Sequence, residues 1–206
     1  MKYYIIAGEA SGDLHASNLI KALQKKDADA HFRFWGGDLM EETGGTLVKH
    51  YRDLAFMGFL EVIANLKTIL NNLKFCKEDI LKYDPDILIL VDYPGFNMRI
   101  ATFGKQKGIR IHYYISPQIW AWKENRIKKI KRDVDEMYVI LPFEKDFYEK
   151  NHGFPVHFVG HPLLDAIASR KQVSEKDFRK EHALNDKSII ALLPGSRKQE
   201  IKKCSL

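Results

Sequence analysis

The chain has 206 residues, of which 45% are hydrophobic and 29% charged, and its formal net charge is +6. This composition is typical of a globular protein of one or two domains with a real core. Cys76 and Cys204 lie far apart, which argues against a disulfide framework or a zinc site and fits a reducing cytosol. We see no signal peptide, and no apolar run approaches the ~20 residues of a membrane span. The positive charge suits an anionic partner such as a phosphate-bearing substrate, nucleic acid or an acidic membrane surface, without choosing among them.

Apolar runs alternate with amphipathic stretches along the chain. Helices are predicted at residues 13–25 and 57–82, with a short helix ending at residue 148. Strands are predicted at residues 3–7, 31–35, 46–50, 86–92, 109–116, 136–142 and 155–160. Unbroken apolar strands between helices indicate a parallel sheet that is covered on both faces. The expected class is therefore α/β, a doubly wound Rossmann-like sheet.

The last part of the chain is expected to begin a second unit. Residues 162–187 are charged and helical in pattern, as in a crossover, and "SIIALLPGSR" at 188–197 reads as a strand followed by a loop. We therefore predict an N-terminal domain at residues 1–165 and an incomplete second domain at 166–206.

The first candidate site is the loop "GEASGD", which follows the first predicted strand. Ligands of parallel α/β sheets bind beyond the carboxyl ends of the strands. Gly8 and Gly12 permit close approach of a ligand to the backbone, while Glu9 and Ser11 can hydrogen-bond sugar hydroxyls. The loop has no Lys or Arg, and Glu9 would repel a phosphate. The alternative is a plain tight turn in which Asp13 caps the helix.

The second candidate site is "VDYPGFN". Asp92 ends a strand that is expected to be buried on both faces, so partial desolvation raises its proton affinity and suits a general base. Asn97 is expected to cap the following helix. The alternative is a strand-end Asp that accepts hydrogen bonds from loop amides. His161, in "VGHP", lies at a later strand end and is a candidate for binding substrate or capping a turn.

Trp120 and Trp122 lie beside a basic stretch, "SPQIWAWKENRIKKIKRD". Aromatic side chains stack on sugars or lie at a lipid interface, and basic residues suit anionic headgroups. The alternative is a solvated helix with buried tryptophans. No RNA-binding signature accompanies these charges, so no nucleic acid partner is expected.

Residues 54–76 form a helical pattern with a broad apolar face. Such a helix is either deeply buried or lies on a bilayer. The pattern alone favours burial.

"LPGSR" near the end of the chain is the better anion candidate. Gly195 permits close approach of an anion to the backbone, and Arg197, which follows Ser196, suits bidentate contact with a diphosphate.

Together these motifs resemble one family closely, the lipid A disaccharide synthases. The matching stretches are "AGEASGD", "MGFLEV", "VDYPGFN", "YYISPQIWAW", "LPFEK", "VGHP" and "LPGSR", and they occur in the family's order over nearly the whole chain. The resemblance implies an inverting glycosyltransferase of the GT-B fold, with two Rossmann-like domains. Such an enzyme joins UDP-2,3-diacylglucosamine to 2,3-diacylglucosamine 1-phosphate (lipid X) by a β-1,6 linkage and releases UDP.

The resemblance also implies roles for particular residues. Asp92 is the expected catalytic base, and Glu9 is the second candidate for this role. Arg197, with Gly195 and Ser196, is expected to hold the UDP diphosphate. The expected substrate-binding residues are Gly8, Ser11, Gly12, Asp13, Asn97, Ser116, Gln118, Trp120 and His161.

A membrane patch is implied as well, formed by Leu60, Val62, Ile63, Leu66, Ile69 and Leu70, with Lys123, Arg126, Lys128 and Lys129 near anionic headgroups. The protein is then expected to be cytoplasmic and peripheral on the inner membrane. No cofactor and no metal are expected.

The sequence departs from the family in length, since family members continue well beyond "LPGSRKQEIKK". We therefore expect a C-terminally truncated chain that does not turn over alone. Two rival interpretations stay open, a UDP-sugar 2-epimerase and a non-catalytic fragment that binds lipid X or membrane.

Overall fold

The computed structural model describes residues 1–54, 66–168, 170 and 172–193. The chain forms two compact units, Met1–Ala166 and Ile167–Leu206, which are described separately.

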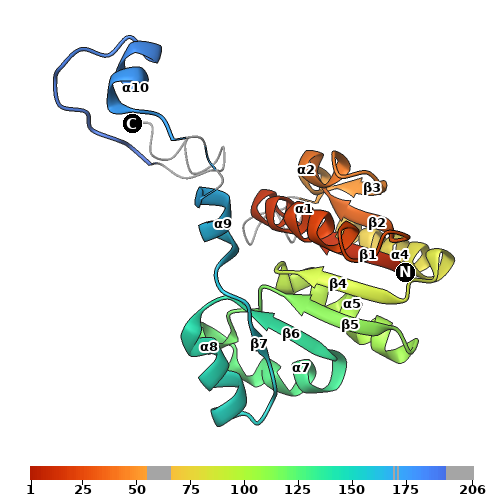
Figure 1. Cartoon of the computed structure of the whole chain (residues 1–206). Coiled ribbons are helices and arrows are strands. Elements are labelled where there is room, and N and C mark those ends of the chain that lie inside the picture. The colour runs from red at the N-terminus through yellow and green to blue at the C-terminus, as the bar shows by residue number, and fades with distance from the viewer. Residues whose placement is uncertain (55–65, 169, 171, 194–206) are drawn as a thin grey trace. The chain divides into compact units, whose positions relative to one another are not determined.

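The first unit is built on a seven-stranded sheet in which every pairing is parallel (Figure 1). Its strand order is β3-β2-β1-β4-β5-β6-β7. All seven strands predicted between residues 3 and 160 are present, which confirms the predicted α/β class. The strands are β1 Lys2–Ala7, β2 His31–Gly36, β3 Thr46–His50, β4 Ile87–Val91, β5 Arg110–Tyr114, β6 Glu136–Val139 and β7 His157–Phe158.

Helices connect these strands, and the bounds of the helices that the sequence predicted differ from the predicted ones. They are α1 Ala10–Gln24, α2 Asp38–Glu41, α4 Leu66–Tyr83, α5 Pro94–Gln106, α6 Ile119–Trp122, α7 Ile127–Asp133, α8 Pro142–Asp146 and α9 Pro162–Ala168. A π-helical turn, Phe147–Asn151, extends α8. The prediction that the first helix starts at residue 13 was wrong, because α1 begins at Ala10. Of the predicted helix at 57–82, residues 57–65 lie outside the described part of the chain.

Side chains of β1 alternate between two hydrophobic clusters, as a strand covered on both faces requires. Tyr4 and Ile6 belong to a cluster that includes residues of α4, α5 and α7. Tyr3 and Ile5 belong to a second cluster, which includes Ala16 and Ile20 of α1. Figure 1 shows α1 on one face of the sheet and α5 on the other.

The central strands end at the same level. Ala7 is in register with Val91, Val91 with Tyr114, and Tyr114 with Tyr138. The loops that follow β1, β4 and β5 therefore leave the sheet at one edge. Strand order reverses between β1 and β4, and this switch point is where ligands of open α/β sheets bind.

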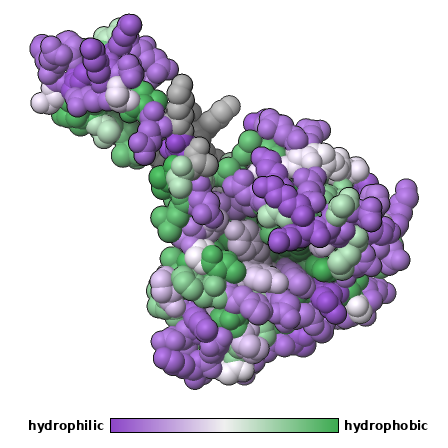
Figure 2. Space-filling model, viewed as in Figure 1, coloured by the Kyte–Doolittle hydropathy of each residue, from purple (hydrophilic) through white to green (hydrophobic). Residues whose placement is uncertain are grey.

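The second unit has little core among its described residues. Helix α10, Glu175–Glu181, begins at Ser174, whose hydroxyl accepts a hydrogen bond from the Asp177 amide. None of the described residues after 166 is buried. On the first unit, hydrophilic residues cover most of the face that Figure 2 shows.

The predicted strand at 188–197 was wrong for residues 188–193, which form no regular structure. Ile190 and Leu192 are 85% and 86% exposed. A strand needs a neighbour to pair its backbone groups, and the described part of this unit contains no other strand.

Candidate functional site

Two carboxylates come together at the switch point between β1 and β4. Glu9 directly precedes α1 as its N-cap residue, and Asp92 directly follows β4. Burial raises the pKa of the Asp92 carboxyl, and the negative charge of Glu9 raises it further. The structure thus brings together the two residues that were predicted to be catalytic. A carboxylate with raised proton affinity is suited to accept a proton.

The backbone at this edge adopts conformations that are rare for residues with a side chain. Asp92 and Tyr93 have φ of 44° and 48°, and Ile115, which directly follows β5, has φ of 62°. The left-handed region costs such residues about 1–2 kcal/mol each. Strain of this kind is typical of functional sites, where it aims particular side chains.

Gly8 is required by the packing of this edge. A Cβ atom at Gly8 would lie 2.3 Å from Cδ1 of Tyr93. The aromatic ring therefore rests directly on the backbone of the first loop. This contact ties the loop after β1 to the loop after β4. Gly12 is buried beside Ala7 and Ser11 is exposed.

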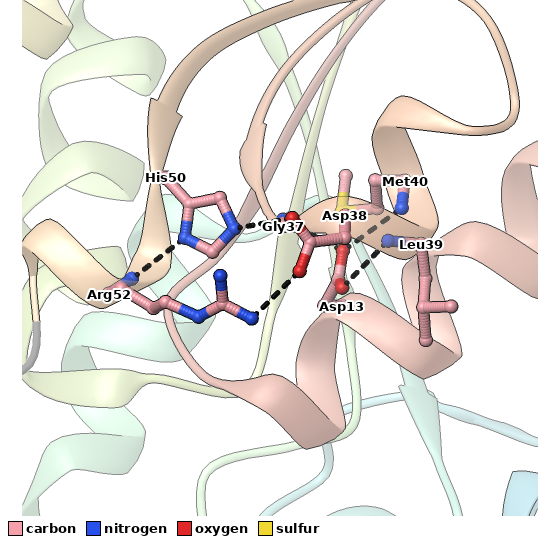
Figure 3. Close-up of polar contacts among 7 residues, drawn as sticks. All are labelled: Asp13, Gly37, Asp38, Leu39, Met40, His50 and Arg52. Carbon is pink, nitrogen blue, oxygen red and sulfur yellow. Dashed lines mark hydrogen bonds and ion pairs between the residues drawn. The ribbon is translucent and has the colours of Figure 1, made fainter.

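Asp13 does not cap its own helix, so that alternative interpretation was wrong. Its buried carboxylate reaches the N-terminus of α2 and accepts hydrogen bonds from three backbone amides (Figure 3). The distances are 2.8 Å from Gly37, 3.1 Å from Leu39 and 3.1 Å from Met40. The geometry gives Asp13 a structural task, and its direct contact with substrate stays a prediction.

Asn97 does not cap α5, contrary to expectation. It lies inside this helix, is fully buried, and directs its amide at backbone carbonyls of the strand ends. Nδ2 lies 2.8 Å from the Asp92 oxygen, 3.2 Å from the Val91 oxygen and 3.4 Å from the Ile6 oxygen. The direct contact of Asn97 with substrate stays a prediction.

Glu144 organises the loop after β5 and was missed by sequence reasoning. Its side chain is 1% exposed and accepts hydrogen bonds from the Ser116 hydroxyl at 2.7 Å and the Trp120 indole at 3.4 Å. Its other oxygen accepts from the amides of Ile140 and Leu141. The only sequence signal was a glutamate in the first turn of the helix after Pro142. Two predicted substrate-binding residues, Ser116 and Trp120, thus share one anchor.

His15 is a second residue that sequence reasoning missed. It lies on α1, is 8% exposed, and its Nδ1 atom has no hydrogen-bond partner among the described residues. Burial lowers its pKa, and the nearby His161 imidazole lowers it further. His161, which follows β7, accepts a hydrogen bond from the Leu163 amide. The predicted site residue His161 therefore lies near His15 of helix α1, and the lowered pKa favours the neutral imidazole of His15 at pH 7.

The tryptophan-containing loop is exposed, so the alternative of buried tryptophans was wrong for Trp122, which is 69% exposed. The Lys123 ammonium and the Arg126 guanidinium lie over its ring, 4.2 and 5.7 Å from the centroid. Trp120 makes an edge-to-face contact with the exposed Phe143. Gln118 is exposed beside them. This surface combines aromatic rings with positive charge.

The predicted membrane patch is only partly described. Leu60, Val62 and Ile63 lie outside the described residues, as does the side chain of Leu66. On α4, Leu70 is 52% exposed, whereas Ile69 packs against the core. Among the described residues, no helix combines the length and apolar character needed to cross a bilayer. The predicted diphosphate residues Gly195, Ser196 and Arg197 also lie outside the described residues.

Comparison with solved structures shows the fold. A UDP-GlcNAc 2-epimerase from Neisseria meningitidis, bound to UDP-GlcNAc, matches 82% of this chain and 48% of its own, with a TM-score of 0.59 and 11% identity. A putative UDP-N-acetylglucosamine 2-epimerase from Listeria monocytogenes matches 87% of this chain and 50% of its own, with a TM-score of 0.62 and 13% identity. At such identities the likeness concerns architecture, so it does not favour the epimerase interpretation.

Comparison of sequences gives the family. The family model described as lipid-A-disaccharide synthetase matches residues 3–206. The lipid-A-disaccharide synthase of Trichlorobacter lovleyi is 42% identical over 205 residues, and synthase 1 of Legionella pneumophila strain Lens is 46% identical over 200 residues. Each alignment covers 97% of this chain but only 51% and 52% of these relatives, so the chain spans about half their length. The chain belongs to the lipid-A-disaccharide synthase family.

Proposed function

We propose that this chain supplies the acceptor-binding and base-carrying part of a lipid-A-disaccharide synthase. The reaction joins UDP-2,3-diacylglucosamine to lipid X by a β-1,6 linkage and releases UDP. Membership of the family supports this proposal. The observation that carries it is the carboxylate pair at the switch point, where burial and the charge of Glu9 raise the pKa of Asp92.

In the proposed mechanism Asp92 is the general base. The 6-hydroxyl oxygen of lipid X attacks the anomeric carbon of the donor, and its proton passes to the Asp92 carboxylate. A bond from that oxygen to the carbon forms while the bond from the carbon to the diphosphate breaks, so UDP leaves with the electron pair and the configuration inverts. Glu9 contributes by raising the basicity of Asp92, because two neighbouring carboxylates resist sharing negative charge.

The sugar of the acceptor is proposed to lie on the first loop, against the backbone at Gly8 and Gly12 and the side chain of Ser11. A loop without cations suits hydroxyl groups rather than a phosphate. The UDP diphosphate of the donor is assigned to Gly195, Ser196 and Arg197 as a prediction. This class of reaction needs no cofactor if hydrogen-bond donors and cationic side chains stabilise the leaving diphosphate.

We further propose that the protein works at the cytoplasmic face of the inner membrane as a peripheral protein. Both substrates carry acyl chains, so their reacting sugars lie near a lipid surface. The exposed Leu70 on α4 supports this proposal, together with Trp122 and its two cationic neighbours. Aromatic rings and basic side chains are favoured at lipid interfaces.

The test combines binding with turnover on the purified 206-residue chain. Lipid X in detergent is titrated into the chain, and UDP release is measured with both substrates present. The variants are Asp92→Asn, which keeps the shape of the side chain but cannot accept the proton, and Asp86→Asn as a matched control. Asp86 precedes the same strand at its opposite end, where it accepts a hydrogen bond from the Lys2 amide.

We expect lipid X to bind the unmodified chain and Asp86→Asn alike. If UDP is released, Asp92→Asn is expected to abolish the release. Binding without turnover would favour the second candidate function, a non-catalytic acceptor-binding part. No binding of lipid X would refute the proposal for this chain.

A further inference from the structure

Hydrogen bonds hold the backbone of Asp92 at both its amide and its carbonyl group. Its amide donates to the Tyr114 carbonyl of the neighbouring strand β5 at 3.0 Å. Its carbonyl oxygen accepts two hydrogen bonds, one from the Tyr113 hydroxyl at 2.7 Å and one from Asn97 Nδ2 at 2.8 Å. Both donor side chains are fully buried.

These contacts coincide with the left-handed backbone of Asp92, whose φ is 44°. Such a conformation persists only where its surroundings enforce it. Two buried donors on one carbonyl oxygen provide that enforcement, because rotation of the Asp92 peptide toward an ordinary conformation would break the hydrogen bond of the buried Tyr113 hydroxyl and the shortest of the hydrogen bonds of Asn97 Nδ2.

The same rotation would redirect the Asp92 side chain. In the observed conformation the carboxylate lies close enough to Glu9 for the charge of Glu9 to act on it, and close enough to Tyr113 for its own charge to act on the tyrosine hydroxyl. The buried Tyr113 hydroxyl therefore lies next to the turn that carries the Asp92 carboxylate.

We propose that Tyr113 and Asn97 are positioning residues for Asp92, which hold its backbone in the left-handed conformation and so aim its carboxylate beside Glu9 at the switch point. Neither residue needs to contact a substrate. The catalytic meaning of this arrangement rests on the proposed function, whereas the arrangement itself is a property of the chain alone.

The test is the pKa of the Asp92 carboxyl, measured by 13C NMR titration of aspartate-labelled chain and assigned with Asp92→Asn. Tyr113→Phe removes one hydroxyl and little volume. The matched control is Tyr4→Phe, because Tyr4 is also a fully buried tyrosine, and its hydroxyl donates to the Asp79 carboxylate instead.

We expect the raised pKa of Asp92 to fall toward about 3.9, the ordinary value, in Tyr113→Phe, because the turn relaxes and the carboxylate gains water. Tyr4→Phe should lose stability without moving this pKa. An unchanged Asp92 pKa in folded Tyr113→Phe would overturn the proposal.

Asn97→Ala gives a second route if Tyr113→Phe does not fold, since it removes the other donor and predicts the same direction of shift. Lipid X titration of the unmodified chain separates the two proposals. A shifted Asp92 pKa together with absent lipid X binding would support the positioning role and refute the proposed function. If turnover is present, Tyr113→Phe should lower kcat by about 10–100-fold with KM nearly unchanged.

Discussion

Replacing Asp13 by Ala should destabilise the first unit strongly, although the Asp13 carboxylate bonds to the start of α2 and not to its own helix. The carboxylate, which is 3% exposed, is the acceptor for three amides at the start of α2. The amides at the start of a helix have no partner within it, so the side chain of α1 serves as the cap of α2.

The magnitude follows from these three hydrogen bonds. A bond to a charged group contributes about 1.5–3 kcal/mol, and an amide left buried without an acceptor costs about 1–3 kcal/mol. The three bonds share one carboxylate and are not additive, so we expect a total loss of about 3–5 kcal/mol. For a unit of this size each kcal/mol lowers Tm by about 2–4 °C, which predicts a fall of about 6–20 °C.

The assay is urea and thermal unfolding of the 206-residue chain, with Asp38→Ala as the control. Asp38 belongs to the same cluster in Figure 3, but it is 55% exposed and pairs with His50 and Arg52 near solvent. Exposed ion pairs contribute about 0–1 kcal/mol. Asp13→Asn, which keeps one acceptor oxygen, should fall between the two. Equal losses in Asp13→Ala and Asp38→Ala would refute the capping argument.

Three further predictions concern the site. Because the folded-state pKa of Asp92 is raised, its ionised form destabilises the fold. This penalty is absent below the unfolded-state pKa of about 3.9 and complete above the folded-state value, so Asp92→Asn should melt higher than the parent chain at pH 7 and alike at pH 3. Gly8→Ala should cost about 1–3 kcal/mol in urea unfolding through its clash with Tyr93, whereas Gly95→Ala, with open space at its Cβ, should cost nothing measurable. Glu144→Ala leaves four donors without their acceptor and should cost about 2–4 kcal/mol while shifting tryptophan fluorescence; an unchanged spectrum would contradict the anchoring role.

Local sequence signals predicted the elements of the sheet well. Apolar runs bounded by Gly, Pro and charged residues placed the seven strands of the sheet, most plainly β4, in which all five residues are apolar and buried. Strand ends were less accurate, and β7 is only His157–Phe158 where six residues were predicted. The same apolar signal at 188–193 predicted a strand that is not there, because pairing depends on a neighbour that the sequence pattern does not specify.

The sequence by itself determined the class of fold and the family, and it placed Glu9 and Asp92 after two of the predicted strands. These follow from residue order, because the carboxyl ends of parallel strands meet on one side of the sheet. Only the tertiary structure decided what Asp13, Asn97, Tyr113 and Glu144 do. Asp13, Asn97 and Tyr113 bond to backbone groups that are distant in sequence, and Glu144 accepts hydrogen bonds from the distant side chains of Ser116 and Trp120. Such partners are chosen by packing in three dimensions, which no local pattern of residues records.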